Sequence, residues 1–184
     1  MNRLASPSQL RASLLRWALV CVPGVMLLGF LAGRLSGGAD NNPWFDALAK
    51  PDLYPPPIVF PVVWGILYAV MGFALAIVCA ARGARGRPLA IRLFWVQLAL
   101  NLAYTPLFFA ARQITGAQIL LFALSVAVLA TAVAFWRVRR SAGLLMLPYL
   151  AWVLFATVLN WQFLRLNPDA DGASPAAATQ RVEL

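Results

Sequence analysis

Long apolar runs separated by polar connections dominate the hydrophobic pattern of this chain. Five runs reach the roughly 20 residues that a helix needs to cross a bilayer. They cover residues 14–33, 58–81, 91–111, 116–136 and 142–164. The apolar positions in these runs are continuous rather than alternating, which excludes a membrane β-barrel. The pattern therefore predicts an all-α membrane protein, built as a bundle of five transmembrane helices.

Composition indicates the same class of protein and limits the number of domains. Hydrophobic residues make up 62% of the 184 residues and charged residues 11%, against about 25% charged residues in soluble domains. The mean hydropathy is +0.76. We expect a basic N-terminal segment over residues 1–13, one transmembrane domain over 14–167, and a disordered tail rich in Ala, Ser, Pro and Asp over 168–184.

The basic residues predict the orientation of the bundle. Ten of the 15 lie at the end that holds the N-terminus: Arg3, Arg11, Arg16, Arg82, Arg85, Arg87, Arg92, Arg137, Arg139 and Arg140. The other five are Arg34, Lys50, Arg112, Arg165 and Arg181. Because arginine-rich connections stay in the cytoplasm, we expect a cytoplasmic N-terminus, with the first connection and the C-terminus outside. A helical bundle favours the bacterial inner membrane, and the absence of a soluble basic face argues against nucleic-acid binding.

The first apolar run has two interpretations. Arg3, Arg11 and Arg16 precede it, as basic residues precede the core of a signal peptide. However, the run is longer than a typical signal-peptide core, and no clean small-x-small cleavage site precedes Leu35. These features favour a retained first helix.

The stretch over residues 44–72 is the most informative of the chain. It starts in a connection of 24 residues, 34–57, between the first two predicted helices. Prolines that each fix φ stiffen this connection: Pro51, Pro55, Pro56 and Pro57. It continues into a helix on which Trp64, Tyr68 and Met71 share one face. A stiff loop next to an aromatic face predicts a long lid over a site.

Polar side chains within the apolar runs mark two further faces, because such groups are costly in a bilayer. Helical spacing places one set on a face of segment 91–111: Gln97, Asn101, Tyr104 and Phe108. It places another on a face of segment 142–164: Tyr149, Trp152, Ala156, Asn160 and Phe163. Aromatic rings with a few hydrogen-bonding groups suit a flat, largely apolar ligand with polar edges.

The pattern alone leaves structural alternatives open. Asn and Gln in membrane helices often bond only to a neighbouring helix, and Trp and Tyr often mark the membrane interface.

A kink is expected at Pro106. Small residues at four-residue spacing allow close helix approach, but in an Ala-rich chain this spacing also arises by chance, so it leaves a homodimer open. They are Gly29 and Gly33, then Gly72, Ala76 and Ala80, then Ala99 and Ala103.

The inventory of reactive side chains is short. The chain has no histidine and six carboxylates, all in the first connection or the tail. Cys21 and Cys79 lie within apolar runs and form no CxxC pair, so we expect no disulfide framework. Neither a metal site nor a conventional acid–base pair is expected.

Four motifs within residues 42–167 occur in the order and at the spacing of a known protein family. They are Trp44 with the Lys50-Pro51 and Pro55-Pro56 pairs, VWGILYAVMG at 63–72, LNLAYTPLFF at 100–109, and PYLAWVLFATVLNWQFLRLN at 148–167. In these motifs the chain resembles the TspO/MBR family, the bacterial tryptophan-rich sensory proteins and mitochondrial translocator proteins. The resemblance extends over all five predicted helices.

This resemblance implies a five-helix bundle, commonly a homodimer, with a pocket closed by the first loop. Family members bind porphyrins such as protoporphyrin IX, so a tetrapyrrole is the expected ligand and no cofactor is required. The resemblance implies pocket positions at Trp64, Asn101, Tyr104, Trp152 and Ala156. It implies lid positions at Trp44, Lys50, Pro51, Pro55 and Pro56.

The sequence departs from the family pattern at two places. Many relatives have Trp where this chain has Leu53, which predicts weaker stacking of the lid on a porphyrin. Animal members, which also bind cholesterol, carry a Tyr where this chain has Trp161, ahead of Arg165. We therefore do not expect cholesterol binding.

Three functions follow as hypotheses. The first is a membrane sensor or carrier of porphyrin that modulates tetrapyrrole metabolism. In it, Trp64 and Trp152 enclose the macrocycle, Asn101 contacts it, and Lys50 pairs with a propionate. The second is light-dependent breakdown of protoporphyrin through electron exchange with Trp64 or Trp152, the only candidate catalytic residues. A coupled transporter is least supported, because no carboxylate lies within the runs, no intramembrane charge suggests ion coupling, and no ATPase motif is present.

Overall fold

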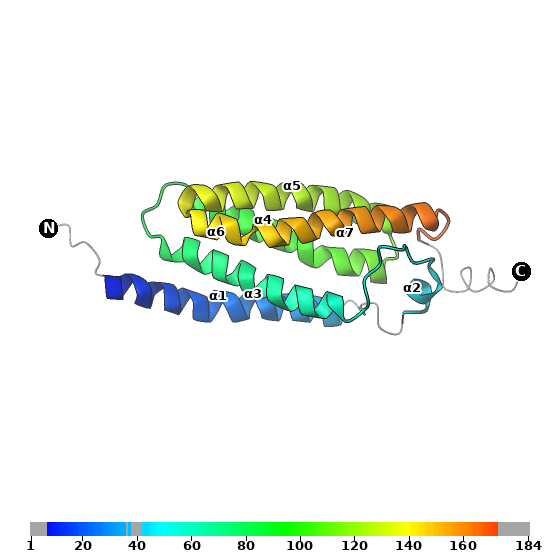
Figure 1. Cartoon of the computed structure of the whole chain (residues 1–184), viewed down its shortest axis with the longest axis horizontal. Coiled ribbons are helices and arrows are strands. Elements are labelled where there is room, and N and C mark those ends of the chain that lie inside the picture. Colours follow the sequence, from blue (N-terminus) through cyan, green and yellow to red (C-terminus); the bar gives the residue numbers. More distant parts are fainter. Residues whose placement is uncertain (1–6, 36, 38–41, 173–184) are drawn as a thin grey trace, which may run out of the picture.

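The computed structural model describes residues 7–35, 37 and 42–172. In this part of the chain five stretches are long and apolar enough to cross a membrane, and Figure 1 shows them side by side as one elongated bundle. The predicted fold class is confirmed. The helices are α1 (Pro7–Leu35), α2 (Pro43–Ala47), α3 (Val59–Ala80), α4 (Arg87–Thr105) with the π-helical turn η1 (Pro106–Ala110), α5 (Ile114–Val138), α6 (Arg140–Leu145) and α7 (Leu147–Leu166).

The ends of the transmembrane domain differ from the expected boundaries. α1 already begins at Pro7, so most of the expected basic N-terminal segment is helical. At the other end, residues 168–172, the start of the expected tail, form hydrogen bonds to the lid, to Arg112 and to the start of α5. Residues 1–6 and 173–184, the remainder of the two expected terminal segments, lie outside the described residues.

Two prolines change the course of their helices because each lacks an N–H donor. At Pro106, α4 passes into the π-helical turn η1, in which Ala111 N donates to the Pro106 carbonyl at 2.9 Å. This turn is the local distortion expected at Pro106. Pro148 lies in the first turn of α7, where a proline is tolerated, and α6 and α7 are separated at Met146.

α1 packs mainly against α3, at two glycines. A Cβ atom at Gly72 would lie 2.7 Å from the Val22 Cα and 2.8 Å from the Cys21 carbonyl oxygen, so the two backbones approach closely here. A Cβ atom at Gly29 would collide with the Tyr68 ring. Gly29 and Gly72 thus serve packing within the monomer. Nothing lies within 4 Å of a Cβ at Gly33.

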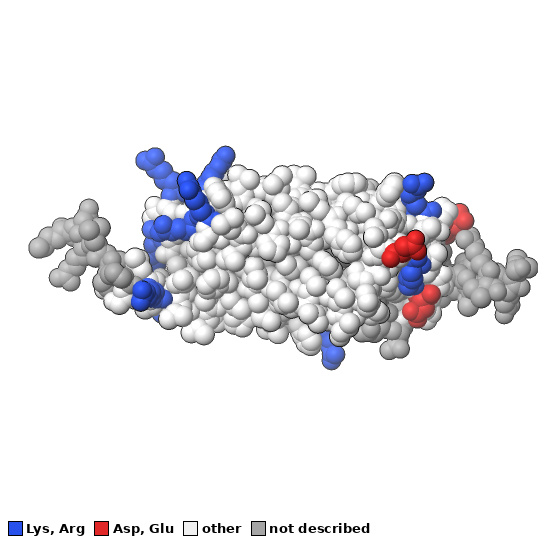
Figure 2. Space-filling view, viewed as in Figure 1, with Lys and Arg blue, Asp and Glu red and all other residues white. Residues whose placement is uncertain are grey.

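Most of the charged side chains visible in Figure 2 gather at the two ends of the bundle. The connections between α3 and α4 and between α5 and α6 carry arginines at the end where α1 begins. Every acidic residue that the structure describes lies at the other end: Asp46, Asp52, Asp169 and Asp171. The lid and the start of the tail share that end (Figure 1).

The close contact at Gly72 gives a test of the packing of α1 on α3. Gly72→Ala should lower the free energy of unfolding by about 1–3 kcal/mol, because the new methyl group meets rigid backbone atoms. Thermal unfolding in detergent, followed by circular dichroism, measures the loss. Gly65→Ala on the same helix is the matched control, since nothing lies within 4 Å of its added Cβ. Equal melting temperatures for the two variants would contradict this contact.

Candidate functional site

The lid is organised around the short helix α2. The Asn42 side chain accepts a hydrogen bond from Phe45 N at 3.2 Å and so caps the helix, and Pro43 occupies its first turn. Trp44 is fully buried and Phe45 is 5% exposed, so both side chains of this short helix point into the bundle. They contact the ring of Phe108 edge to face, at centroid distances of 5.6 and 6.1 Å. The lid is therefore anchored by aromatic packing.

Lys50 closes the other end of α2. Its ammonium group donates to the carbonyl oxygens of Phe45 and, at 3.1 Å, of Leu48, and it stands 4.3 Å from the centroid of the Phe45 ring. Burial lowers the pKa of Lys50, an effect that the nearby Asp46 carboxylate opposes. In this arrangement the ammonium stabilises the lid, and pairing with a propionate would have to replace one of these bonds.

The residues after α7 fasten the lid to the bundle. Asn167 and Ala49 exchange two hydrogen bonds, from Ala49 N to Asn167 Oδ1 at 2.8 Å and from Asn167 Nδ2 to the Ala49 carbonyl at 3.0 Å. Trp44 Nε1 donates to the Ala170 carbonyl at 3.1 Å. Asp171 accepts from the first backbone N–H groups of α5, Ile114 at 2.5 Å and Thr115 at 3.2 Å. We call residues 167–171 the latch.

A chain of aromatic rings connects the lid to the middle of the bundle. Tyr54 contacts Phe60 at a centroid distance of 5.5 Å, and Phe60 contacts Trp152 at 6.0 Å. Burial raises the pKa of Tyr54. On α3, Trp64 stacks on Tyr68 at 5.2 Å and meets Tyr149 of α7 edge to face at 6.3 Å. These rings occupy the space below the lid, so a flat ligand has to displace them and lift the lid.

One polar group joins α3, α4 and α7 beside these rings. The Tyr68 hydroxyl donates to Asn101 Oδ1 at 2.9 Å. The buried Tyr149 hydroxyl lies near the same carboxamide without a well-formed hydrogen bond. Gln97, one turn earlier on α4, is fully buried, and neither its oxygen nor its nitrogen has a hydrogen-bond partner. An orphaned buried carboxamide is costly, which makes Gln97 a candidate contact for a bound polar group.

A second polar group lies closer to the lid. Asn160 accepts a hydrogen bond from the Tyr104 hydroxyl at 3.4 Å and donates to Gln118 Oε1 at 2.8 Å and to the Ile114 carbonyl at 3.2 Å. Gln118 of α5 is missing from the predicted site, although a glutamine within an apolar run was a usable signal. The network joins α4, α5 and α7, in agreement with the structural interpretation of membrane Asn and Gln.

The other predicted site residues lie at the edges of these groups. Ala156 is half-buried, one turn after Trp152 on α7. In the lid, Pro51 is buried, Pro55 half-buried and Pro56 exposed. Leu53, the position where many relatives have Trp, is 51% exposed and contributes little to the packing below it.

Taken together, the fold and this arrangement define a helical membrane protein with a lidded aromatic site. The model of the TspO/MBR family matches residues 19–166. Protein CrtK of Rhodobacter capsulatus is 39% identical over 144 residues, which are 76% of this chain and 90% of that protein. The tryptophan-rich sensory protein of Cereibacter sphaeroides is 39% identical over 124 residues, 67% and 77% of the two chains. The human translocator protein is 38% identical over 142 residues, 76% and 84% of the two chains.

The chain therefore belongs to the TspO/MBR family and is an integral multi-pass membrane protein. Membership of this family, with relatives named as sensory and translocator proteins, supports a role as a membrane receptor or sensor.

The hydrogen bonds between the latch and the lid give a test of what keeps the lid closed. Asn167→Ala removes both hydrogen bonds to Ala49, each contributing about 0.5–1.5 kcal/mol, so the amides of α2 and Ala49 should exchange roughly tenfold faster. Hydrogen–deuterium exchange of the detergent-solubilised protein measures this rate. Leu166→Ala, an exposed neighbour on the same turn, is the control and should leave the lid amides unchanged. Equal exchange in the two variants would show that Asn167 does not hold the lid.

Proposed function

We propose that this protein is a membrane sensor that binds a porphyrin of the protoporphyrin IX type between α3, α4 and α7 and so modulates tetrapyrrole metabolism or transport. The observation that carries the proposal is the set of rings and amides below the lid. Trp64, Tyr68 and Trp152 supply flat apolar surfaces, while Asn101 and the unpartnered Gln97 supply polar groups. A tetrapyrrole combines a large aromatic face with polar nitrogen atoms and carboxylate edges, which fits such a lining.

In the proposed cycle, the latch releases and the lid swings away with Trp44 and Phe45. The porphyrin then replaces the ring contacts that now connect Tyr54, Phe60 and Trp152. Its propionates remain at the lid end. The basic residues available there are Lys50, in the lid, and Arg112, between η1 and α5. Closing the lid again buries the macrocycle and slows its release.

The remaining features of the proposal concern the setting of the protein. We place the arginine-rich end in the cytoplasm and the lid outside, in a bacterial inner membrane. We also propose a homodimer, for which the lipid-facing surface of α4 is a candidate interface, since the small residues Ala99 and Ala103 are exposed there. The proposal requires no cofactor, and it assigns no role to nucleic acid or cholesterol.

Two tryptophans provide the test of porphyrin binding. The double variant Trp64→Ala/Trp152→Ala should bind protoporphyrin IX about tenfold more weakly, because both aromatic surfaces are lost. Titration in the dark, followed by the porphyrin absorbance and by tryptophan quenching, gives the dissociation constant. Trp95→Ala/Trp136→Ala removes two tryptophans that are 48% and 45% exposed on the outside of the bundle, and it should bind as the unchanged protein does. Wild-type affinity in the first variant would refute this site.

A second function, light-dependent breakdown of the bound porphyrin, is favoured by one observation. Trp64 stacks on Tyr68, and the Tyr68 hydroxyl donates to Asn101, so two oxidisable rings lie next to the proposed macrocycle. A photoexcited porphyrin takes one electron from the Trp64 indole, which leaves an indole radical cation and a porphyrin radical anion. Dioxygen is the oxidant that such a breakdown consumes.

Bleaching under light separates the two functions. If the protein degrades porphyrin, the bound porphyrin should lose its absorbance faster than free porphyrin under the same light in air. The loss should slow under argon and in Trp64→Phe, which keeps an aromatic ring but is harder to oxidise. Bound porphyrin that bleaches no faster than free porphyrin would exclude breakdown and leave the sensor proposal standing.

A further inference from the structure

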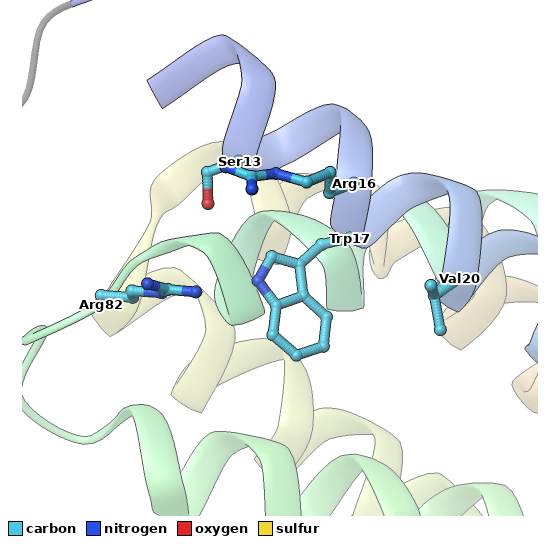
Figure 3. Close-up of a pocket in the computed structure, with 5 residues that line it drawn as sticks. All are labelled: Ser13, Arg16, Trp17, Val20 and Arg82. Carbon is cyan, nitrogen blue, oxygen red and sulfur yellow. The ribbon is translucent and has the colours of Figure 1, made fainter. Parts of the chain in front are cut away.

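A groove far from the lid lies at the arginine-rich end of the bundle. Its volume is about 260 Å³, and it is lined by Ser13, Arg16, Trp17, Val20 and Arg82. The first four residues recur at helical spacing along one face of α1, and Arg82 follows the end of α3. Figure 3 shows the Trp17 ring projecting from α1 into the groove, between Arg82 and Val20.

The polar groups of this groove are donors for an anion. Arg16 and Arg82 each present a guanidinium, Trp17 an indole N–H and Ser13 a hydroxyl. Arg16 uses its Nε atom to donate to the Ala12 carbonyl at 3.2 Å, which positions the side chain along α1. Among the described residues no carboxylate competes for these donors, because residues 1–39 and 53–168 contain neither Asp nor Glu and the described acidic residues lie at the lid end. The positive charge of the groove is therefore not neutralised by a carboxylate of the described residues, and it attracts an anion.

The position of the groove matches the headgroup layer of a membrane. With 29 residues, α1 is roughly 43 Å long, whereas the hydrocarbon core is about 30 Å thick, so its first turns extend beyond the core. The excess is about 13 Å, or roughly nine residues, so Ser13 lies in those turns while Arg16 and Trp17 follow at the edge of the core. Tryptophan favours this interface, and a long arginine side chain reaches from it toward the headgroups. Val20, 64% exposed, and Leu19, 76% exposed, come next along α1 and present an apolar surface to an acyl chain.

We propose that this groove binds the phosphate of an anionic phospholipid from the leaflet that faces the arginine-rich end. Arg16 and Arg82 hold the phosphate oxygens, the Trp17 indole and the Ser13 hydroxyl donate to the same headgroup, and the acyl chains run along α1 past Val20. The lipid thereby connects α1, which packs mainly on α3, to the start of the α3–α4 connection. The volume of the groove is below the roughly 300–1,000 Å³ of pockets for drug-sized ligands, which argues against a second porphyrin site here.

Native mass spectrometry of the purified full-length protein in detergent tests this site. Titration with phosphatidylglycerol and with phosphatidylcholine should show a preference for the anionic lipid. Arg16→Gln/Arg82→Gln should weaken phosphatidylglycerol binding about tenfold or more, since both positive charges that attract the phosphate are lost. Arg85→Gln/Arg139→Gln removes the same charge from the same end but not from the groove, and it should retain the preference.

Other outcomes would overturn the proposal. Equal loss in both double variants would show diffuse attraction to the arginines, and equal binding of the two lipids would exclude an anion site. Displacement of phosphatidylglycerol by inorganic phosphate at constant ionic strength would assign the groove to free anions rather than to lipid. Thermal unfolding shows whether each variant is folded. Trp17→Phe keeps an aromatic ring and loses the N–H donor, so it should weaken phosphatidylglycerol binding less than Arg16→Gln/Arg82→Gln does.

Discussion

The cost of placing hydrogen-bonding groups inside an apolar bundle governs this structure. Only a few polar side chains lie within the spans, and most find partners on another helix. Tyr68 bonds to Asn101, and Asn160 connects α5 and α7 through Gln118. These bonds fix the relative rotation of the helices, so that the aromatic faces meet. In Gln97 both polar atoms of the side chain lack a partner, and an unsatisfied carboxamide beside packed rings supports the proposal of a ligand site there.

The lid shows how contacts remote in sequence produce one closed unit. α2 has too few residues to be stable alone, and its helix is kept by the Asn42 cap, the Lys50 bonds and the burial of Trp44. The latch adds hydrogen bonds from beyond α7. Opening the lid requires these interactions to break together. Access to the aromatic rings below it therefore depends on whether residues 167–171 stay bound to the lid.

The two ends of the bundle have different chemistry, which separates their proposed roles. The lid end carries all the described acidic residues and closes over the aromatic site. The other end carries arginines without carboxylate partners and holds the groove between α1 and Arg82. Charge separation of this kind orients a helical protein in a membrane. It also separates the proposed lipid groove at one end from the proposed ligand site at the other.

Sequence by itself determined the five spans, the charge asymmetry and which aromatic and polar residues share a helix face, because these follow from local apolar length and helical period. It could not place the latch, since Asn167 and Ala49 meet only after five helices have folded back on one another. The π-helical turn at Pro106 and the pairing of Gln118 with Asn160 also depend on tertiary contacts. Helical period predicts which residues share a face, whereas only packing decides what that face touches.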